Sequence, residues 1–300
     1  MTPAGSSGRL SLGACAAVAL GLSLASPAVE GLAWGAASQA PGRSEVELDQ
    51  ISTFSHVKVT RKGDVRTLWF VRDDGDEVIE SQVDLSRPDE LLVPYTRFMF
   101  LSYAFAPRPE RALIVGLGGG SMVHFLKAKD PALNVDDVEI DPVIVSVADR
   151  YFRVKSGGNV DVKIADGLAY LRDSEAKYDV IYMDAFLRPS GGTDPVGVPK
   201  HLKTEEFYGQ VVRKRLNPNG LVVFNLNPQP TTAQDIRTIR KAFPNVYVFR
   251  LSAHDGFVAV ASADEQAVSR EDVIARAAQL DERFKTSYSF RQMAESLRPN

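Results

Sequence analysis

The chain has 300 residues, of which 44% are hydrophobic and 24% charged. This composition is that of an ordinary globular protein, and it excludes collagen-like, coiled-coil and wholly disordered chains. The formal net charge of -3 gives no long-range attraction to a polyanion, so we expect neither nucleic acid nor an anionic membrane as a main partner. The single cysteine, Cys15, leaves no second thiol for an internal disulfide or a cysteine-ligated metal site.

An uncharged apolar stretch occupies residues 10–29, LSLGACAAVALGLSLASPAV, with one positive charge, Arg9, before it. This pattern is typical of an export signal. Because Ala, Gly and Ser outnumber Leu, membrane insertion would be weak, and we expect cleavage after Ala28 or Ala40. Segment 1–40 is therefore predicted to be a signal peptide or N-terminal anchor of an exported protein. A disordered leader, or a misassigned start, on a cytoplasmic protein is the alternative.

Three β-rich runs follow the leader: ISTFSHVKVT, DVRTLWFVR and EVIESQVDL. They are separated by KGD and DDGD, which have the composition of turns. Alternation and turns together predict a small antiparallel β-domain over residues 45–90. From Leu91 to Phe105 the pattern becomes that of an apolar helix, which Pro107 ends.

From Arg111 onward, short apolar runs alternate seven times with longer amphipathic segments. This alternation predicts a mostly parallel, doubly wound α/β sheet with helices on both faces, and the last two runs predict an antiparallel edge. We assign this domain to residues 91–265 and a C-terminal helical tail to residues 266–300. The apolar stripe of the tail is predicted to be Val273, Ile274, Ala277, Leu280 and Phe284.

The sequence GLGGGS, which contains Gly116, Gly118, Gly119 and Gly120, lies between the first predicted strand of this sheet and its helix. Such a cluster lets the backbone approach a ligand and offers it helix N-terminal N–H groups, although it could also serve only to turn a strand into a helix. A binding site is favoured because Glu139 ends the next strand, about two dozen residues later. A carboxylate there can accept both hydroxyls of a ribose.

Two acids that follow Glu139 have different expected roles, one structural and one in ligand binding. Asp141 and Pro142 are predicted to be the N-cap and first residue of a helix. The third strand ends in IADG, where Asp166 could accept a hydrogen bond from the exocyclic amine of an adenine. A dinucleotide oxidoreductase would share the glycine loop and Glu139. A glycine loop, a ribose-binding acid and an adenine-binding acid at the ends of strands one, two and three are instead the arrangement of the Rossmann-like class I S-adenosylmethionine-dependent methyltransferase fold, which we predict.

A fourth acid, Asp184, ends the fourth strand in YDVIYMDAF. At the carboxyl edge of the sheet it would lie near the reacting sulfonium, where it could orient an amine, accept its proton or stabilise positive charge. A solvated or N-capping aspartate is the alternative. The loop 186–203 is long enough to be a lid, and His201 near its end is either a proton acceptor or a loop anchor.

Other catalytic chemistries find no support in the sequence. His56, His124 and His254 show no metal-ligand spacing, so we expect no metal. No G-x-S-x-G elbow is present, and the only cysteine lies in the leader, which argues against nucleophilic catalysis by serine or cysteine.

The motifs GLGGGS, VEIDP, IADGLAYL, YDVIYMDAF and VPKHLKTEEFY together resemble the spermidine synthase superfamily of polyamine aminopropyltransferases. The resemblance extends from the β-domain to the last strand. It implies that the glycine loop and the two following strand ends hold the donor nucleoside. The residues it assigns to that role are Gly116, Gly118, Gly119, Gly120, Glu139, Asp166 and Gly167, with Gln82 closing the pocket from the β-domain.

Two departures bear on the reaction. In the aminopropyltransferases that this chain resembles, the glycine loop has a sequence similar to GGGDG, and its aspartate holds the aminopropyl ammonium. These enzymes also carry two aspartates three residues apart after the fourth strand. Here we find Ser121 and Leu187 at those places, so two carboxylates that would bind cations are missing. The motifs are closer to those of the spermidine-synthase-like methyltransferases.

We therefore expect a transferase that uses S-adenosylmethionine or its decarboxylated form as co-substrate, with Asp184 as the catalytic residue. Methyl transfer is preferred because the polyamine-binding acids are absent. A polyamine aminopropyltransferase and a non-catalytic nucleoside-binding protein are the alternatives, the latter because an exported enzyme would lack a donor made in the cytoplasm. The expected partner is a small-molecule or peptide amine acceptor, and a homodimer is compatible with the resemblance.

Overall fold

The computed structural model describes residues 44–251 and 256–299. The predicted leader over residues 1–40, with Cys15, and the isolated His254 lie outside these residues. In the described part of the chain, no helix combines the length and the apolar character that a membrane span requires.

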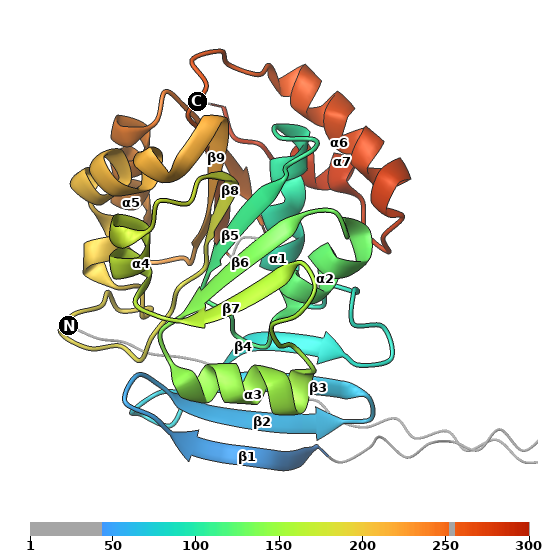
Figure 1. The fold of residues 1–300 in the computed structure, drawn as a ribbon, viewed down its shortest axis with the longest axis vertical. Helices are drawn as coiled ribbons and strands as arrows, with labels where there is room; N and C mark the ends of the chain where they lie inside the picture. The colour runs from blue at the N-terminus through green and yellow to red at the C-terminus, as the bar shows by residue number, and fades with distance from the viewer. Residues whose placement is uncertain (1–43, 252–255, 300) are drawn as a thin grey trace, which may run out of the picture. The chain divides into compact units, whose positions relative to one another are not determined.

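An antiparallel sheet of four strands forms the N-terminal part (Figure 1). Its strands lie side by side in chain order: β1 (Glu45–Ile51), β2 (His56–Lys62), β3 (Val65–Val71) and β4 (Glu77–Asp84). The sequence predicted only the last three. Strand β1, with the sequence EVELDQI, is an edge strand whose mostly exposed, acidic residues weaken the alternation of apolar side chains.

The predicted helix over residues 91–105 is divided in two. Helix α1 (Pro94–Met99) begins with a proline in its first turn, where no backbone N–H is needed, and continues as the 3₁₀ helix η1 (Phe100–Ala104). All five side chains of η1 are buried. This segment therefore belongs to the core, as its apolar composition indicates.

The second sheet has seven strands in the order β10-β11-β9-β8-β5-β6-β7. Strands β5 to β9 are parallel to their neighbours within this set, whereas β11 is antiparallel to both β9 and β10. The predicted doubly wound sheet with an antiparallel edge is thus confirmed. Its strands are β5 (Arg111–Val115), β6 (Asn134–Glu139), β7 (Val160–Ile164), β8 (Tyr178–Met183), β9 (Leu216–Leu226), β10 (Asn245–Arg250) and β11 (Phe257–Ser262).

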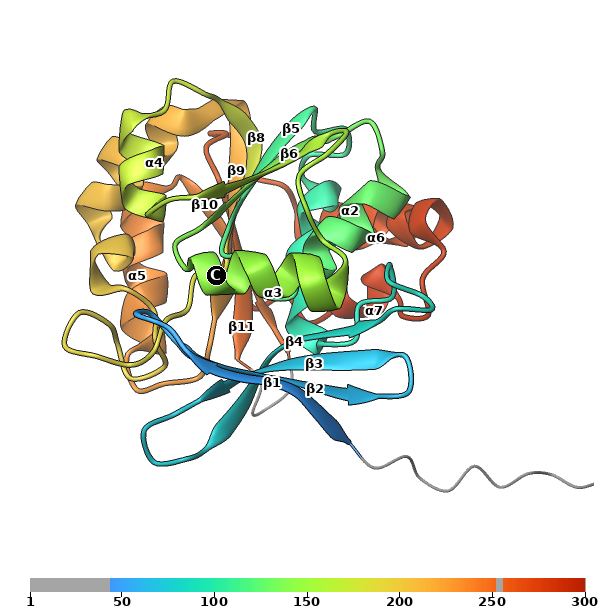
Figure 2. The same ribbon diagram turned by 60° about the horizontal axis from the view of Figure 1, so that its bottom comes forward.

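Helices cover both faces of the second sheet (Figures 1 and 2). One core lies between the sheet and α1, η1, α2 (Ser121–Lys129), α3 (Pro142–Phe152), α6 (Arg270–Phe284) and α7 (Phe290–Ala294). The other lies between the sheet and α4 (Gly167–Asp173), η3 (Phe207–Val212) and α5 (Thr232–Ala242). The π-helical turn η3 is followed directly by a 3₁₀ turn, η4 (Arg213–Arg215).

The tail helix α6 packs as its apolar stripe predicts. Val273, Ala277, Leu280 and Phe284 are buried, and Ile274 is half-buried against the same core. The aromatic ring of Phe284 contacts the rings of Tyr103 and Phe125 edge-on, so the tail completes the core beneath η1 and α2.

Helix α3 lies between the two sheets (Figures 1 and 2). Asp141 caps it as predicted, because its Oδ1 accepts a hydrogen bond from the Val143 N–H at 2.9 Å. The other oxygen of Asp141 accepts a hydrogen bond from Ser52 Oγ, between β1 and β2. This contact fixes the N-terminal sheet against the carboxyl edge of the second sheet, where the site is expected.

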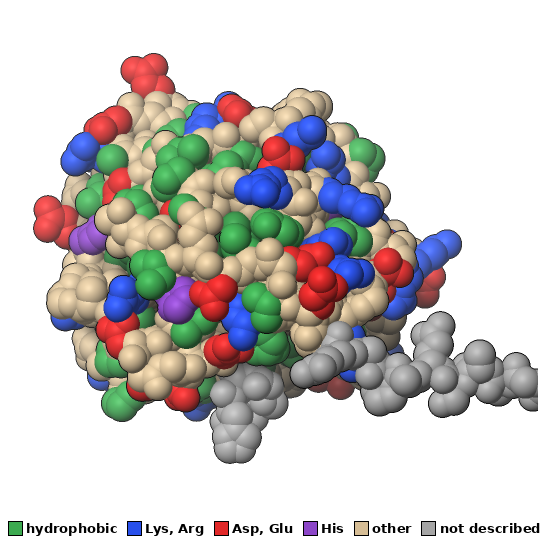
Figure 3. All heavy atoms as spheres, turned by 90° about the horizontal axis from the view of Figure 1, so that it is seen from below, with side chains coloured by type: hydrophobic (Ala, Val, Ile, Leu, Met, Phe, Trp, Pro, Cys, Tyr) green, Lys and Arg blue, Asp and Glu red, His purple; other side chains and the backbone are tan. Residues whose placement is uncertain are grey.

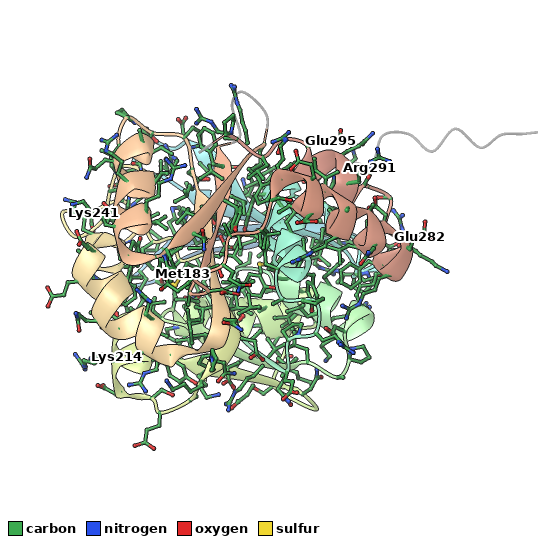
Figure 4. All side chains as sticks on the ribbon, turned by 90° about the horizontal axis from the view of Figure 1, so that it is seen from above. Met183, Lys214, Lys241, Glu282, Arg291 and Glu295 are labelled. Atoms are coloured by element: carbon green, nitrogen blue, oxygen red, sulfur yellow. The ribbon has the colours of Figure 1, made fainter. Side chains whose placement is uncertain are left out.

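The carboxyl end of β8 lies inside the molecule, since Met183 is buried. Figure 4 shows Met183, the last residue of β8, inside the molecule, whereas Lys214, Lys241 and Glu282 lie around its outside. On the face shown in Figure 3, basic and acidic side chains are interspersed. That face therefore offers no continuous basic stripe of the kind that binds nucleic acid.

Candidate active site

One cavity lies at the carboxyl ends of the parallel strands β5, β6, β7 and β8. Its lining includes Gly116 after β5, Glu139 at the end of β6, Asp166 and Gly167 after β7, and Asp184 after β8, and its volume is about 580 Å³. We call it the strand-end cavity. The strand order reverses between β5 and β8, which is where ligands bind in open α/β sheets. The sequence placed these residues at one sheet edge, and the structure brings them together.

The four loop glycines differ in their surroundings. Gly116 and Gly118 line the strand-end cavity, Gly120 lines a smaller cavity next to it, and Gly119 lines neither. A Cβ on Gly119 would lie 2.9 Å from Ser81 Oγ and 3.0 Å from the Phe152 ring. Gly119 therefore allows β4 and α3 to pack against the loop, and its predicted nucleoside contact has no counterpart in the lining of these cavities.

Glu139 connects the glycine loop to the start of α3. Its Oε2 accepts a hydrogen bond from the Leu117 N–H at 3.0 Å, and its Oε1 accepts one from the Asp141 N–H at 2.8 Å. Burial raises the pKa of Glu139 to about 7, against the lowering effect of these backbone bonds. Each oxygen keeps a lone pair for a further donor, so the carboxylate is arranged to accept the two ribose hydroxyls predicted for it.

Asp166 serves as the N-cap of α4. Its Oδ1 accepts a hydrogen bond from the Ala169 N–H at 2.8 Å, while its Oδ2 lies 4.0 Å from His201 Nε2. That separation is too long for a hydrogen bond, so His201 does not anchor its loop through Asp166. Oδ2 is the atom that remains for an adenine amine, and His201 lines the same cavity.

Asp184 is buried and held by two neutral donors. Tyr95 OH donates to its Oδ2 at 2.8 Å, and Asn225 Nδ2 donates to its Oδ1 at 2.9 Å. Burial raises the pKa of Asp184 to about 7, although both hydrogen bonds lower it. Because Asp184 is only 9% exposed and no helix follows it, the alternative of a solvated or capping aspartate does not apply.

A carboxylate that the sequence analysis missed, Glu80, comes from the N-terminal sheet. Strand β4 carries a bulge, in which Leu68 pairs with Ser81 and Trp69 with Ile79, so that Glu80 is left without a partner on β3. A bulge redirects a side chain, and Glu80 lines the strand-end cavity. Burial, followed by the Asp184 and Glu139 charges, raises its pKa well above the ordinary value.

Gln82, which the resemblance assigned to pocket closure, does not line the strand-end cavity. It pairs in register with Thr67 on β3, and its side-chain amide donates to Thr67 Oγ1 at 2.9 Å. The residue that β4 contributes to the cavity is Glu80, two positions earlier, because of the bulge.

A second cavity of about 750 Å³ lies between the N-terminal sheet and loop 186–203. We call it the junction cavity. It shares Phe70, Glu80, Phe186 and Leu187 with the strand-end cavity. Tyr95 and Asn225, the two donors to Asp184, line the junction cavity, whereas Asp184 itself lines the strand-end cavity. Asp184 and its partners therefore form part of the wall between the two.

Loop 186–203 is held over the strand-end cavity by a nearly buried ion-pair cluster. Lys203 Nζ lies 2.6 Å from Asp194 Oδ2 and 2.7 Å from Asp235 Oδ2, the latter on α5. Gln229 Nε2 donates to the same Asp194 oxygen at 2.8 Å. The cluster fixes the segment that carries His201 and Leu202 into the cavity lining.

Replacing Lys203 with methionine should lower the free energy of unfolding by about 3 to 5 kcal/mol, because two nearly buried carboxylates lose their shared cation. Denaturant unfolding measures this loss. Lys200→Met is the matched control, since Lys200 is exposed and bonds only the Gly191 carbonyl, so its change should stay within about 0.5 kcal/mol. Equal losses in the two variants would show that the cluster does not hold the loop.

The two other histidines of the described part of the chain have structural partners. His56 Nε2 is 2.7 Å from Asp49 Oδ1, and His124 Nε2 is 2.7 Å from the Phe152 carbonyl oxygen. Among residues 44–251 and 256–299, no three His, Cys, Asp or Glu side chains are arranged to hold a metal ion. The absence of a metal thus remains an expectation from the sequence.

Comparison of the sequence with known proteins shows that the chain is related to transferases. Residues 96–254 match the spermine/spermidine synthase domain. The polyamine aminopropyltransferase of Vibrio vulnificus is 31% identical over 219 residues, which cover 72% of this chain and 71% of that protein. The eEF1A lysine and N-terminal methyltransferase of Xenopus laevis is 28% identical over 223 residues, which cover 70% of this chain and 31% of that protein.

A solved structure shares the fold. A spermidine synthase in complex with the transition-state analogue AdoDATO superposes with a TM-score of 0.64 and 20% identity, over 85% of each chain. At this identity the likeness concerns the fold alone.

Proposed function

Because the chain belongs to the spermine/spermidine synthase family, we propose that it transfers an aminopropyl group from decarboxylated S-adenosylmethionine to the nitrogen of an amine acceptor. Membership agrees with the resemblance drawn from the sequence motifs. The comparisons favour aminopropyl transfer over the methyl transfer that the sequence preferred, since the match covers 71% of an aminopropyltransferase but 31% of a methyltransferase.

The observation that carries this proposal is the position of two carboxylates at the boundary between two cavities. Glu80 lines both the strand-end cavity and the junction cavity, and Asp184 stands in the wall between them. Glu139 and Asp166 suit the strand-end cavity to a nucleoside donor. The junction cavity is then the place for the acceptor, whose amine would meet Glu80 and the Tyr95–Asp184 pair at the boundary.

The transfer is a direct displacement in which alignment supplies most of the acceleration. The lone pair of the acceptor nitrogen forms a bond to the carbon next to the sulfonium sulfur. The carbon–sulfur bond breaks, its electron pair stays on sulfur, and a neutral thioether leaves. The new substituted ammonium then loses one proton. Asp184 is placed to accept that proton through its carboxylate, and Glu80 to accept a hydrogen bond from an N–H group of the neutral acceptor amine before attack.

The reaction can be tested directly with the purified protein. It should be incubated separately with S-adenosylmethionine and with its decarboxylated form, each with a panel of alkyl diamines and a lysine-containing peptide. Mass spectrometry of the acceptors then distinguishes an added aminopropyl group from a methyl group. Aminopropylated diamine together with methylthioadenosine supports the proposal. A methylated acceptor as the sole product would restore methyl transfer, and failure to bind either donor would contradict the transferase assignment.

A further inference from the structure

The charged residues of the junction cavity bear on the far end of the acceptor, which the proposed function leaves open. Glu80 lines the cavity where it meets the strand-end cavity, and it is the only acid among the described lining residues. The basic residues of the lining are His56, Arg72 and Arg188. Away from the reacting amine, the cavity is therefore bordered by cations and not by carboxylates.

Two of these three basic residues already have an acidic partner. His56 Nε2 lies 2.7 Å from Asp49 Oδ1, and the Arg188 guanidinium pairs with Asp73. Arg72 is half-buried, and its side chain has no hydrogen bond or ion pair with any described residue. A guanidinium without a partner in a cavity wall has five N–H donors to offer to an anionic ligand.

Ser55 is a second donor of the same cavity lining that lacks a partner. The residue is 2% exposed, and its Oγ has no hydrogen-bond partner within the described residues. A tight turn fixes its backbone, because its N–H donates to Ser52 Oγ at 2.9 Å and its carbonyl oxygen accepts from the Ser52 N–H at 2.8 Å. A buried hydroxyl without a partner is costly, so its position at a cavity calls for a ligand that would accept its proton in a hydrogen bond.

Strand pairing brings Ser55 and Arg72 to the same place in the cavity wall. Strands β2 and β3 are antiparallel, with Val57 opposite Phe70. Ser55 lies two positions before Val57. Arg72 lies two positions after Phe70, so the same register sets it opposite Ser55, on the face of the sheet that carries Phe70. Phe70 also lines the junction cavity, which shows that this face of the sheet borders it.

The distance between this donor pair and Glu80 can be spanned by a short chain. Ile79 pairs with Trp69, and Glu80 follows in the bulge of β4. Arg72 comes three positions after Trp69, which corresponds to about 10 Å along the strand. Apolar side chains supply much of the remaining lining, among them Val78, Phe186 and Leu187. The cavity is thus suited to an alkyl chain that carries a polar group at each end.

We propose that the junction cavity binds an acceptor with a primary amine at one end, a short alkyl chain and a carboxylate at the other, and that Arg72 and Ser55 hold the carboxylate. The inference rests on the proposed function, because that function assigns the amine end to Glu80 and Asp184. A carboxylate accepts two parallel hydrogen bonds from a guanidinium and keeps a lone pair for a hydroxyl donor. A diamine would instead bring a second ammonium to Arg72, and like charges repel.

Three acceptors of six carbons isolate the contribution of the far end: 6-aminohexanoate, hexylamine and 1,6-diaminohexane. They share the reacting amine and end in a carboxylate, a methyl group or a second amine. Steady-state kinetics of the purified full chain with decarboxylated S-adenosylmethionine gives kcat/KM for each. We expect the value for 6-aminohexanoate to exceed the other two by about tenfold or more. A wild type that prefers 1,6-diaminohexane would overturn the inference.

Two variants test the assigned contacts. Arg72→Gln should lower kcat/KM for 6-aminohexanoate about 10- to 100-fold, as for the loss of a charge-assisted pair of hydrogen bonds, and should leave hexylamine within about threefold. Ser55→Ala should lower the value for 6-aminohexanoate about two- to tenfold without lowering thermal stability, because the hydroxyl has no partner within the described residues. An equal loss with 6-aminohexanoate and hexylamine in Arg72→Gln would exclude a contact with the carboxylate.

Lys62→Gln is the matched control. Lys62 is exposed at the other end of β2 from Ser55 and does not line the junction cavity. The variant removes one positive charge from the N-terminal sheet, as Arg72→Gln does, but no cavity contact. We expect an unchanged ratio of kcat/KM between 6-aminohexanoate and hexylamine. A fall in this ratio as large as in Arg72→Gln would show that net charge alone sets the preference.

A binding measurement distinguishes failure of this inference from failure of the proposed function. Calorimetry in the presence of 5′-methylthioadenosine gives the affinity of 6-aminohexanoate for the wild type and for Arg72→Gln. Binding that Arg72→Gln weakens, without any aminopropylated product, would contradict the proposed function and retain the carboxylate contact. Aminopropyl transfer to hexylamine and 1,6-diaminohexane, with neither binding nor reaction of 6-aminohexanoate, would retain the function and overturn the inference.

Discussion

Replacing Asp184 with asparagine is expected to lower kcat by about 10²- to 10⁴-fold, the usual contribution of a positioned proton acceptor. Asparagine has nearly the same shape, but its amide accepts no proton. Because Glu139 and Asp166 remain in place, the affinity for the donor should change little. Steady-state kinetics with the decarboxylated donor, together with calorimetric donor binding, separates the loss of turnover from any loss of binding. A fall in kcat smaller than about threefold would exclude Asp184 from the chemical step.

The pH dependence gives this assignment a second readout. Burial raises the pKa of Asp184 to about 7, and only the deprotonated carboxylate can accept a proton, so activity should fall as the pH drops below 7. Glu139 titrates in the same range, so this limb alone does not identify Asp184. Tyr95→Phe removes a hydrogen bond that lowers the pKa of Asp184 without touching Glu139. We therefore expect the acidic limb to move to higher pH in Tyr95→Phe, and an unmoved limb would contradict the assignment.

The meeting of the strand-end acids could be predicted from the sequence because it follows from topology. Glu139, Asp166 and Asp184 each lie at or just after the carboxyl end of a predicted strand, and parallel strands place these ends at one edge of a sheet. No knowledge of distant packing is needed for this inference. The cap at Asp141 was predictable for a similar reason, since an aspartate before proline at the start of a helical pattern is a local signal.

The other parts of the site depend on long-range packing or on a local irregularity. Glu80 reaches the cavity through a bulge in β4, whereas the family resemblance assigned the contact from this strand to Gln82. Tyr95 reaches Asp184 across 89 positions of sequence. Asp137 is buried in the middle of β6, and within the described residues neither of its carboxylate oxygens has a hydrogen-bond partner. The adjacent Asp136 accepts hydrogen bonds from three side chains. Charged residues are rarely buried unless paired, but the sequence could not show which of these two acids has partners.

Gly116→Ala should lower the free energy of unfolding by more than about 4 kcal/mol, the exceptional end of single-residue effects. The backbone of Gly116 has a φ of +105°, where a residue with a Cβ is strained, and that Cβ would lie 2.3 Å from the Asp184 carbonyl oxygen. Relief of this clash requires β5 and β8 to separate where their ends hold the site. We therefore expect a large fall in the midpoint of thermal or denaturant unfolding.

Gly191→Ala is the matched control, because Gly191 lies in loop 186–203 without a positive φ, and a Cβ added there would have nothing within 4 Å. Its stability should stay within about 0.5 kcal/mol of the wild type. If Gly116→Ala folds at low temperature, it should also lose turnover, because the clash displaces the backbone of Asp184 itself. A Gly116→Ala variant as stable and active as Gly191→Ala would contradict the role of this glycine in positioning the carboxylate between the two cavities.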